Sequence, residues 1–135
     1  ISFQTVTLDD REEFANAKRF PTANEVIVLD SFDNCMAGLE VGPDSYVVIA
    51  TRGHTHDRTV LEQALRSDAG YIGMLGSRKK MLDIRKDLLA KGFCEDQLDR
   101  IHCPIGIKID AETAAEIAVS IVAELIQFRA RKWKK

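Results

Sequence analysis

The sequence has few of the features that mark disulfide-linked, membrane or nucleic-acid-binding proteins. Its three cysteines, Cys35, Cys94 and Cys103, are odd in number and form no C-x-x-C pair, which argues against a disulfide framework and a zinc knuckle. No apolar run approaches the ~20 residues that a membrane span needs, and there is no signal-peptide pattern. The net charge of −2 provides no basic surface for nucleic acid. We therefore expect a cytoplasmic protein that binds neither nucleic acid nor membranes.

Short apolar runs alternate with amphipathic helical patterns along the 135 residues, which is typical of a parallel sheet flanked by helices. The apolar runs predict strands at residues 5–8, 26–29, 46–50, 71–75 and 101–103. The helical patterns predict helices at 12–18, at 59–66 with a Thr59–Glu62 capping box, from Ser77 to Gly92, and from Thr113 with a Thr113–Glu116 capping box. We therefore predict one α/β domain over residues 1–135, a Rossmann-like doubly wound parallel sheet.

The segment 71–80 places positive charge where a helix disfavours it. Ser77 is a good N-cap, so Arg78–Lys80 fall in the first helical turn, whose free amide N–H groups are already positive. A bound anion would reverse this repulsion, because a strand, a glycine turn and a helix N-terminus together form a phosphate site. The alternative is a solvated charge run, with Lys79 pairing with Asp83 one turn later.

The loops after the predicted strands meet at one edge of the sheet, where open parallel sheets bind ligands. Asp9 and Asp10 follow the first strand, and loops 51–57, 73–79 and 104–106 follow three others. This edge gathers glycines together with basic and imidazole side chains, which are Arg52, His54, His56 and Lys79. The sequence indicates a polar, locally cationic binding edge more clearly than a reaction centre, because it has no catalytic triad, nucleophile elbow or carboxylate pair.

Three features of this edge allow more than one interpretation. Asp9, at a strand end, either binds a ribose hydroxyl, as in dinucleotide folds, or caps the turn that follows. His54, His56 and Asp57 either hydrogen-bond a ligand or support the structure, and their spacing is poor for one metal ion, so we predict no metal site. Cys103 is either a reactive thiol or an inert core residue.

The chain has no G-x-G-x-x-G motif, which normally follows the first strand of a dinucleotide fold and opens its first helix. Residues 1–3 lead directly into what corresponds to the second strand. In the strand order 3-2-1-4-5 the missing first strand is central, so we expect a slot between strands 5–8 and 46–50. We interpret the chain as part of a longer protein, or as one whose missing strand is supplied elsewhere.

Four segments, taken in order, resemble one family over almost the whole chain. They are Val6–Asn16 (V-T-L-D-D-R-E-E-F-A-N), Val47–Asp57 (V-V-I-A-T-R-G-H-T-H-D), Tyr71–Lys79 (Y-I-G-M-L-G-S-R-K), and Pro104–Ile107 with Ala118–Ile121. Together they are similar to the Rossmann-like C-terminal domain of the XdhC/CoxI family. Arg52 stands where this family commonly has histidine, and Asp110 stands where it commonly has glycine. The family's N-terminal domain, with its cysteine-bearing segment, has no counterpart in these residues.

Members of that family are accessory proteins that bind molybdenum cofactor, assist its sulfuration and deliver it to xanthine dehydrogenase or a related molybdenum hydroxylase. The resemblance therefore implies a non-catalytic maturation factor for molybdopterin or its dinucleotide form. It implies a xanthine dehydrogenase-type apoenzyme and a cysteine desulfurase as partners. It also implies that the cationic edge holds the phosphate or nucleotide end of the cofactor, through Asp9, Thr51, Gly53, His54, Gly73, Gly76, Ser77, Lys79 and Gly106.

Two other functions fit the residues. Asp9 and the predicted fold favour an NAD(P)-dependent oxidoreductase, although the glycine motif and a catalytic pair are missing. Exposed strand edges seek partners, so the open slot also fits a non-catalytic module that pairs two chains into a homodimer. Pterin retention, NADH titration and sedimentation distinguish the three functions.

Overall fold

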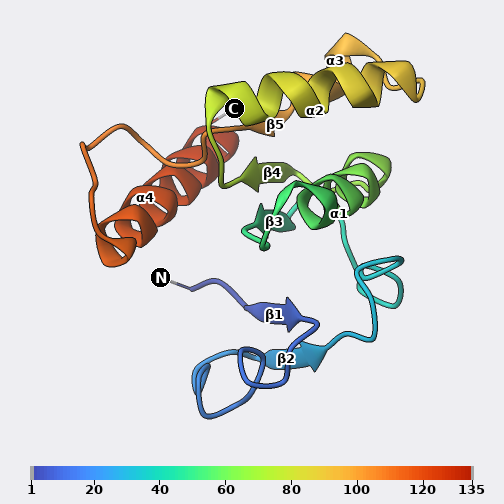
Figure 1. The fold of residues 1–135 in the computed structure, drawn as a ribbon. Coiled ribbons are helices and arrows are strands. Elements are labelled where there is room, and N and C mark those ends of the chain that lie inside the picture. Colours follow the sequence, from blue (N-terminus) through green and yellow to red (C-terminus); the bar gives the residue numbers. More distant parts are fainter. Residues whose placement is uncertain (1, 135) are drawn as a thin grey trace.

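The computed structural model describes residues 2–134, apart from the side chain of His54. Within this range the chain forms five short strands and four helices (Figure 1). The strands are β1 (Val6–Asp9), β2 (Glu25–Val28), β3 (Tyr46–Ile49), β4 (Tyr71–Met74) and β5 (Ile101–His102). The helices are α1 (His54–Arg66), α2 (Arg78–Ala90), α3 (Glu95–Leu98) and α4 (Ala114–Trp133).

The strands form two parallel sheets instead of one continuous sheet. β1 pairs with β2, with Val6 opposite Glu25. β3, β4 and β5 form the second sheet in that order, with Tyr46 opposite Tyr71. β1 and β3 lie on either side of the place that a central strand takes in the order 3-2-1-4-5 (Figure 1). The predicted α/β Rossmann-like fold and the predicted slot are both confirmed.

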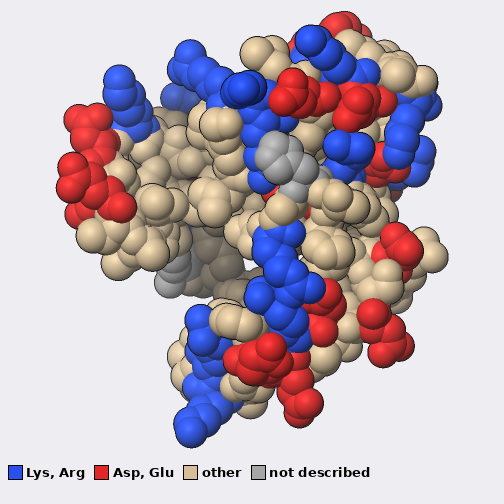
Figure 2. All heavy atoms as spheres, in the orientation of Figure 1, with Lys and Arg blue, Asp and Glu red and all other residues tan. Residues whose placement is uncertain are grey.

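Side-chain contacts bridge both ends of this slot. Before the two strands begin, the ring of Phe3 meets the ring of Tyr46 edge-on, with 5.3 Å between centroids. After the strands end, Nη2 of Arg52 donates to Oδ2 of Asp10 at 2.7 Å. The segments just before β1 and β3 are therefore in contact with each other, and so are the segments just after them. Figure 2 shows the molecule hollowed between the side that holds α4 and the part formed by β1 and β2.

Helices cover both faces of the β3–β5 sheet. Side chains alternate along a strand, so Ile72 and Met74 of β4 join the main hydrophobic core with α1 and α2. Tyr71 points to the other face, where Phe128 of α4 meets its ring at 5.3 Å. Among the described residues of α4 only Ser120 is classed as buried, so most of this helix remains partly or fully exposed.

Two predicted helix starts are confirmed. Oγ of Ser77 accepts a hydrogen bond from the N–H of Lys80 at 3.1 Å and so caps α2. α4 begins at a complete capping box, in which Thr113 accepts from the N–H of Glu116 and Glu116 accepts from the N–H of Thr113, both at 3.1 Å. Gly92, with φ of 100°, follows the end of α2 as predicted.

The predicted helix at residues 12–18 is wrong, because this segment forms only turns. The side-chain amide of Asn16 donates to the backbone carbonyls of Glu12 and Glu13, at 2.9 and 3.1 Å. It therefore occupies acceptors that a helix needs for its own backbone bonds.

The predicted start of the following helix at Thr59 is also wrong, since α1 begins at His54. Thr59 lies inside the helix, where its hydroxyl donates back to the carbonyl of Thr55 at 3.0 Å, so it caps nothing. Among the helices described, none is both long and apolar enough to cross a membrane.

Candidate functional site

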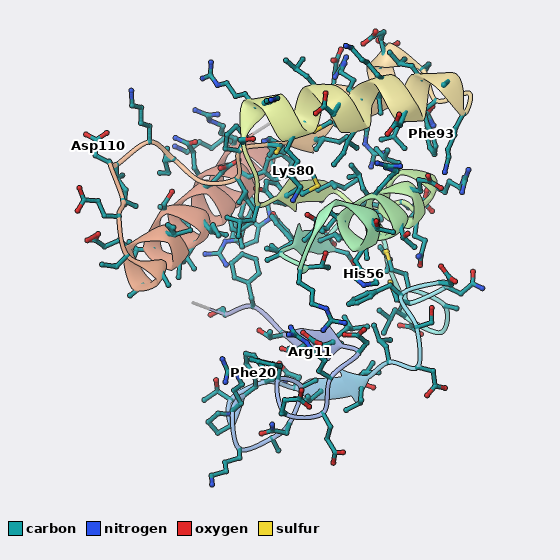
Figure 3. The ribbon with its side chains drawn as sticks, in the orientation of Figure 1. Arg11, Phe20, His56, Lys80, Phe93 and Asp110 are labelled. Carbon is teal, nitrogen blue, oxygen red and sulfur yellow. The ribbon has the colours of Figure 1, made fainter. Side chains whose placement is uncertain are left out.

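The loops that follow β3 and β4 lie at the edge of the sheet formed by the C-terminal ends of its strands. The buried side chain of Asp57 contacts residues of both connections, Thr51 and Lys80. Asp57 of α1 is completely buried. Its Oδ1 accepts from the backbone N–H of Thr51 at 3.1 Å and from the Thr51 hydroxyl at 2.5 Å. Its Oδ2 forms an ion pair with Nζ of Lys80, which also donates to the carbonyl of Leu75 at 3.4 Å. Figure 3 shows Lys80 reaching from the start of α2 toward α1.

This ion pair explains one of the three cations at the start of α2. The side chain of Lys80 is only 15% exposed and lies close to Gly76. The Asp57 carboxylate, which forms the ion pair with it, compensates its positive charge. Arg78 and Lys79 are exposed, and neither forms an ion pair with any residue that the structure describes, Asp83 included. The free N–H groups at this helix start therefore lie beside two uncompensated positive charges.

The carboxylates of Asp9, the last residue of β1, and of Asp10, which follows it, are both engaged by arginines. Oδ1 of Asp9 accepts from the backbone N–H of Arg11 at 2.9 Å and from its Nε at 3.1 Å (Figure 3). Burial raises the pKa of Asp9, but the hydrogen bonds from Arg11 outweigh it, so the pKa is lowered overall. This geometry favours the capping interpretation of Asp9. The carboxylate of Asp10 binds Arg52 across the slot instead.

Most of the predicted binding residues lie on the two loops that Asp57 joins. Thr51 is bonded to Asp57 directly, and Gly53 is the N-cap of α1 with φ of 84°, a conformation that favours glycine. His54 begins α1, and its side chain lies outside the part that the structure describes. Gly76 and Ser77 form the turn into α2, next to Lys79. The structure therefore brings these positions to one edge of the sheet.

Gly73 and Gly106 have packing reasons to be glycine. A Cβ at Gly73, inside β4, would lie 2.5 Å from Cδ1 of Ile105 and 2.6 Å from the hydroxyl of Tyr71. Gly106 has φ of 101°, and a Cβ there would lie 2.2 Å from Oγ of Ser120. Contact of either glycine with a ligand stays a prediction, because close packing alone accounts for both residues.

Two other residues of the edge are packed against the protein. The ring of His56 lies 4.7 Å from the ring of Phe32. Sγ of Cys103 lies 3.7 Å from the carbonyl oxygen of Gly76. Burial raises the pKa of the Cys103 thiol, and the nearby Lys80 charge only partly opposes this. Cys103 therefore resembles an inert core thiol more than a reactive one.

The sequence interpretation does not pair Asp57 with Lys80, although a signal for this pair is present. Each residue lies in the first turns of a helix that follows a strand, and the two strands are neighbours in a parallel sheet. The carboxyl ends of such strands share one edge, so oppositely charged residues just beyond them are placed to meet. The charge pattern instead groups Lys80 with Arg78 and Lys79 as a single run.

The model of the XdhC Rossmann domain matches residues 1–125. The chain belongs to the XdhC family. This XdhC domain is 32% identical over 129 residues to a protein of Bacillus subtilis named as a probable component of xanthine dehydrogenase, covering 96% of the chain and 37% of that protein. It is 29% identical over 94 residues to the molybdenum cofactor insertion chaperone PaoD of Escherichia coli, covering 69% of the chain and 29% of PaoD.

A solved structure has the same fold as this XdhC domain. The crystal structure of a xanthine dehydrogenase from Bacillus halodurans matches with a TM-score of 0.78 and 34% identity, over 96% of the chain and 36% of that protein. The chain thus spans roughly a third of the length of these relatives. The family resemblance seen in the four sequence segments is confirmed.

Proposed function

We propose that this XdhC domain binds molybdenum cofactor at the carboxyl edge of its sheet and assists the maturation and insertion of that cofactor into a xanthine dehydrogenase-type enzyme. The observation that carries the proposal is the pair of uncompensated cations, Arg78 and Lys79, at the Ser77-capped start of α2. The family membership and the printed role of PaoD, a molybdenum cofactor insertion chaperone, support it.

The residues at this edge fit the phosphate end of the cofactor. Oγ of Ser77 caps the N–H of Lys80, which leaves the N–H groups of Arg78 and Lys79 directed out of the helix start. Amide N–H groups at a helix start bind phosphate oxygens, and adjacent cations strengthen this binding. Thr51, Gly53 and His54, at the neighbouring strand-to-helix connection, form the adjoining wall of the proposed site.

In this proposal the cofactor is cargo, and the protein transfers it without reacting with it. The buried Asp57–Lys80 pair holds the two loops in a fixed relation, so the edge is organised before cargo arrives. The apoenzyme that receives the cofactor, and a cysteine desulfurase that supplies sulfur, are the proposed partners.

Titration of the purified chain with molybdopterin tests the proposed site. We expect Ser77→Ala and Lys79→Ala each to weaken binding about tenfold, which corresponds to about 1.4 kcal/mol and is typical of a lost hydrogen bond to a charged group. Lys86→Ala is the matched control, because it removes the same charge from an exposed position later in α2 and should leave binding unchanged. Unchanged pterin affinity in Ser77→Ala and Lys79→Ala, or NADH binding without pterin binding, would contradict the proposal.

A further inference from the structure

A second cluster of titratable side chains joins α4 to β4 and β5, away from the α1 and α2 loops. Glu124 of α4 is 15% exposed at its side chain. Its Oε1 accepts from the hydroxyl of Tyr71 at 3.2 Å and lies 3.1 Å from Nδ1 of His102. Its Oε2 accepts from the backbone N–H of Gly106. Protein donors therefore already engage both oxygens of this carboxylate.

These contacts fix the orientation of the His102 ring. The ring stacks on Tyr71 at 4.6 Å with 18° between the planes, and Phe128 meets it edge-on at 5.7 Å. Nδ1 is directed to Glu124, so Nε2 is the nitrogen left for another partner. No residue that the structure describes bonds to Nε2, and the side chain is 37% exposed. A carboxylate that holds one imidazole nitrogen and leaves the other free is an arrangement suited to binding a ligand.

A hollow of about 370 Å³ opens beside this ring. One wall is the segment 101–107, and α4 supplies the other through Glu124, Gln127 and Arg131. Gln127 and Arg131 are exposed, and neither side chain has a hydrogen bond or an ion pair with any residue within 2–134. The hollow therefore gathers one free imidazole nitrogen, one free amide and one free guanidinium, next to the apolar ring of Phe128.

We propose that this hollow binds a small anion that carries a carboxylate or a phosphate group. Arg131 supplies the planar fork of N–H donors that matches either group, and Gln127 supplies a neutral donor. His102 donates from Nε2 when it is protonated, a state in which its ring lies between the Glu124 carboxylate and the bound anion. Glu124 also lines the hollow, but three of its roughly four acceptor positions are already used by Tyr71, His102 and Gly106.

This proposal rests on His102, Gln127 and Arg131, which are not part of the proposed cofactor site, although Gly106, a predicted cofactor-binding residue, also lines the hollow. Ser77 and Lys79 belong to the turn into α2, whereas the hollow lies between β5 and α4. Tyr71, Gly106 and Glu124 would form the same cluster in a purely structural role. The free donors of Gln127 and Arg131 are what indicate a ligand, so the experiment concentrates on Arg131.

The test is a titration of the 135-residue chain with inorganic phosphate and, separately, with succinate, followed by NMR of the His102 ring and the Gln127 side-chain amide. We expect saturable shifts of both signals at millimolar anion, and the anion that binds more tightly identifies the preferred group.

Arg131→Gln should weaken binding about tenfold. Lys134→Gln, which removes the same charge from the exposed end of α4, should change it less than about twofold. His102→Phe keeps a ring against Tyr71 and should also weaken binding.

Three results would overturn the proposal. The first is the absence of saturable shifts with either anion. The second is equal weakening by Arg131→Gln and Lys134→Gln, since this would indicate diffuse attraction to the end of α4. The third is loss of binding in Lys79→Ala with Arg131→Gln unaffected, because the anion would then bind at α2, and the proposed cofactor site would stand without this one. Arg131 is exposed, so its replacement leaves the fold intact and each result can be interpreted.

Discussion

Asp57 and Lys80 form the most buried ion pair that the structure describes, with side chains 1% and 15% exposed. The two residues come from different helices and connect the loops after β3 and β4. Two charges so far removed from water stabilise a fold only while both are present, because the survivor of a broken pair is left buried without a partner. The pair therefore determines how firmly these two loops are held.

We predict that Lys80→Met destabilises the protein by about 3 kcal/mol, because it leaves the Asp57 carboxylate buried and without its counter-charge. Lys79→Met, one residue earlier and exposed, should change stability by less than about 0.5 kcal/mol. Urea unfolding of the two variants measures this difference. Equal midpoints would mean that the Asp57–Lys80 contact contributes nothing particular to the fold.

The structural roles of individual residues could be predicted from the sequence to different degrees. Ser77 was predictable as a cap, since its role depends only on the helix that follows it. Asp110, which stands where the family commonly has glycine, has φ of 56°, in the region that glycine enters freely and aspartate tolerates. The role of Glu124 was not predictable, because its partners Tyr71, His102 and Gly106 are brought to it by the fold.

Among the elements, α4 is less buried than α1 or α2, and it begins at a complete capping box. Its residues are mostly half-buried or exposed, so hydrophobic packing contributes less than in α1 or α2. The capping box between Thr113 and Glu116 satisfies N–H groups at both residues. The Glu116 carboxylate also accepts from the N–H of Glu112, and these backbone hydrogen bonds lower its pKa. This helix start was predictable because the box is local in sequence.

We predict that the stabilising effect of Glu116 depends on pH. Its pKa is lower in the folded state, so its contribution is present above the ordinary carboxyl range and is lost as pH falls through the folded pKa. Glu116→Gln should therefore be less stable than the natural protein at neutral pH, and the difference should shrink on acidification. Thermal unfolding of both proteins across this range measures it. A difference that stays constant with pH would contradict the assignment.

The wrong helix predictions have local physical causes. The segment 12–18 contains apolar residues at helical spacing, but the Asn16 amide takes the backbone carbonyls of Glu12 and Glu13. The start of α1 was not predicted because its N-cap residue, Gly53, has no side chain that could accept a capping hydrogen bond. Apolar spacing therefore located the strands and the bodies of α1, α2 and α4, but it did not show that the Asn16 side chain prevents a helix at 12–18 or that α1 begins at an uncapped glycine.

At the scale of the whole molecule, the edges of β1 and β3 that face the slot are paired with no strand among residues 2–134. The carbonyls of Thr5 and Asp9 bond toward β2, and those of Ser45 and Ile49 bond toward β4. Because successive backbone groups alternate in direction, those of Val6, Leu8, Tyr46 and Val48 face the slot. The slot itself was predictable from the sequence, because the strand order 3-2-1-4-5 without its first strand leaves the central position open.

Hydrogen exchange tests this arrangement. We expect the amides of Val6, Leu8, Tyr46 and Val48 to exchange at least about tenfold faster than those of their paired neighbours Thr7 and Val47. Equal protection of both sets would show that the slot closes in solution. Protection that rises with protein concentration would support the homodimer that the open edges led us to expect.

Without a shared ladder, the β1–β2 part is coupled to the rest of the molecule chiefly through side chains. Phe3 against Tyr46 and Arg52 on Asp10 are two such couplings, one at each end of the slot. A ring contact resists salt and an exposed ion pair does not, so the two ends differ in their response to ionic strength. High ionic strength should therefore weaken the contact at the Arg52 end of the slot while the ring contact at the Phe3 end persists, and neither outcome breaks a strand pair.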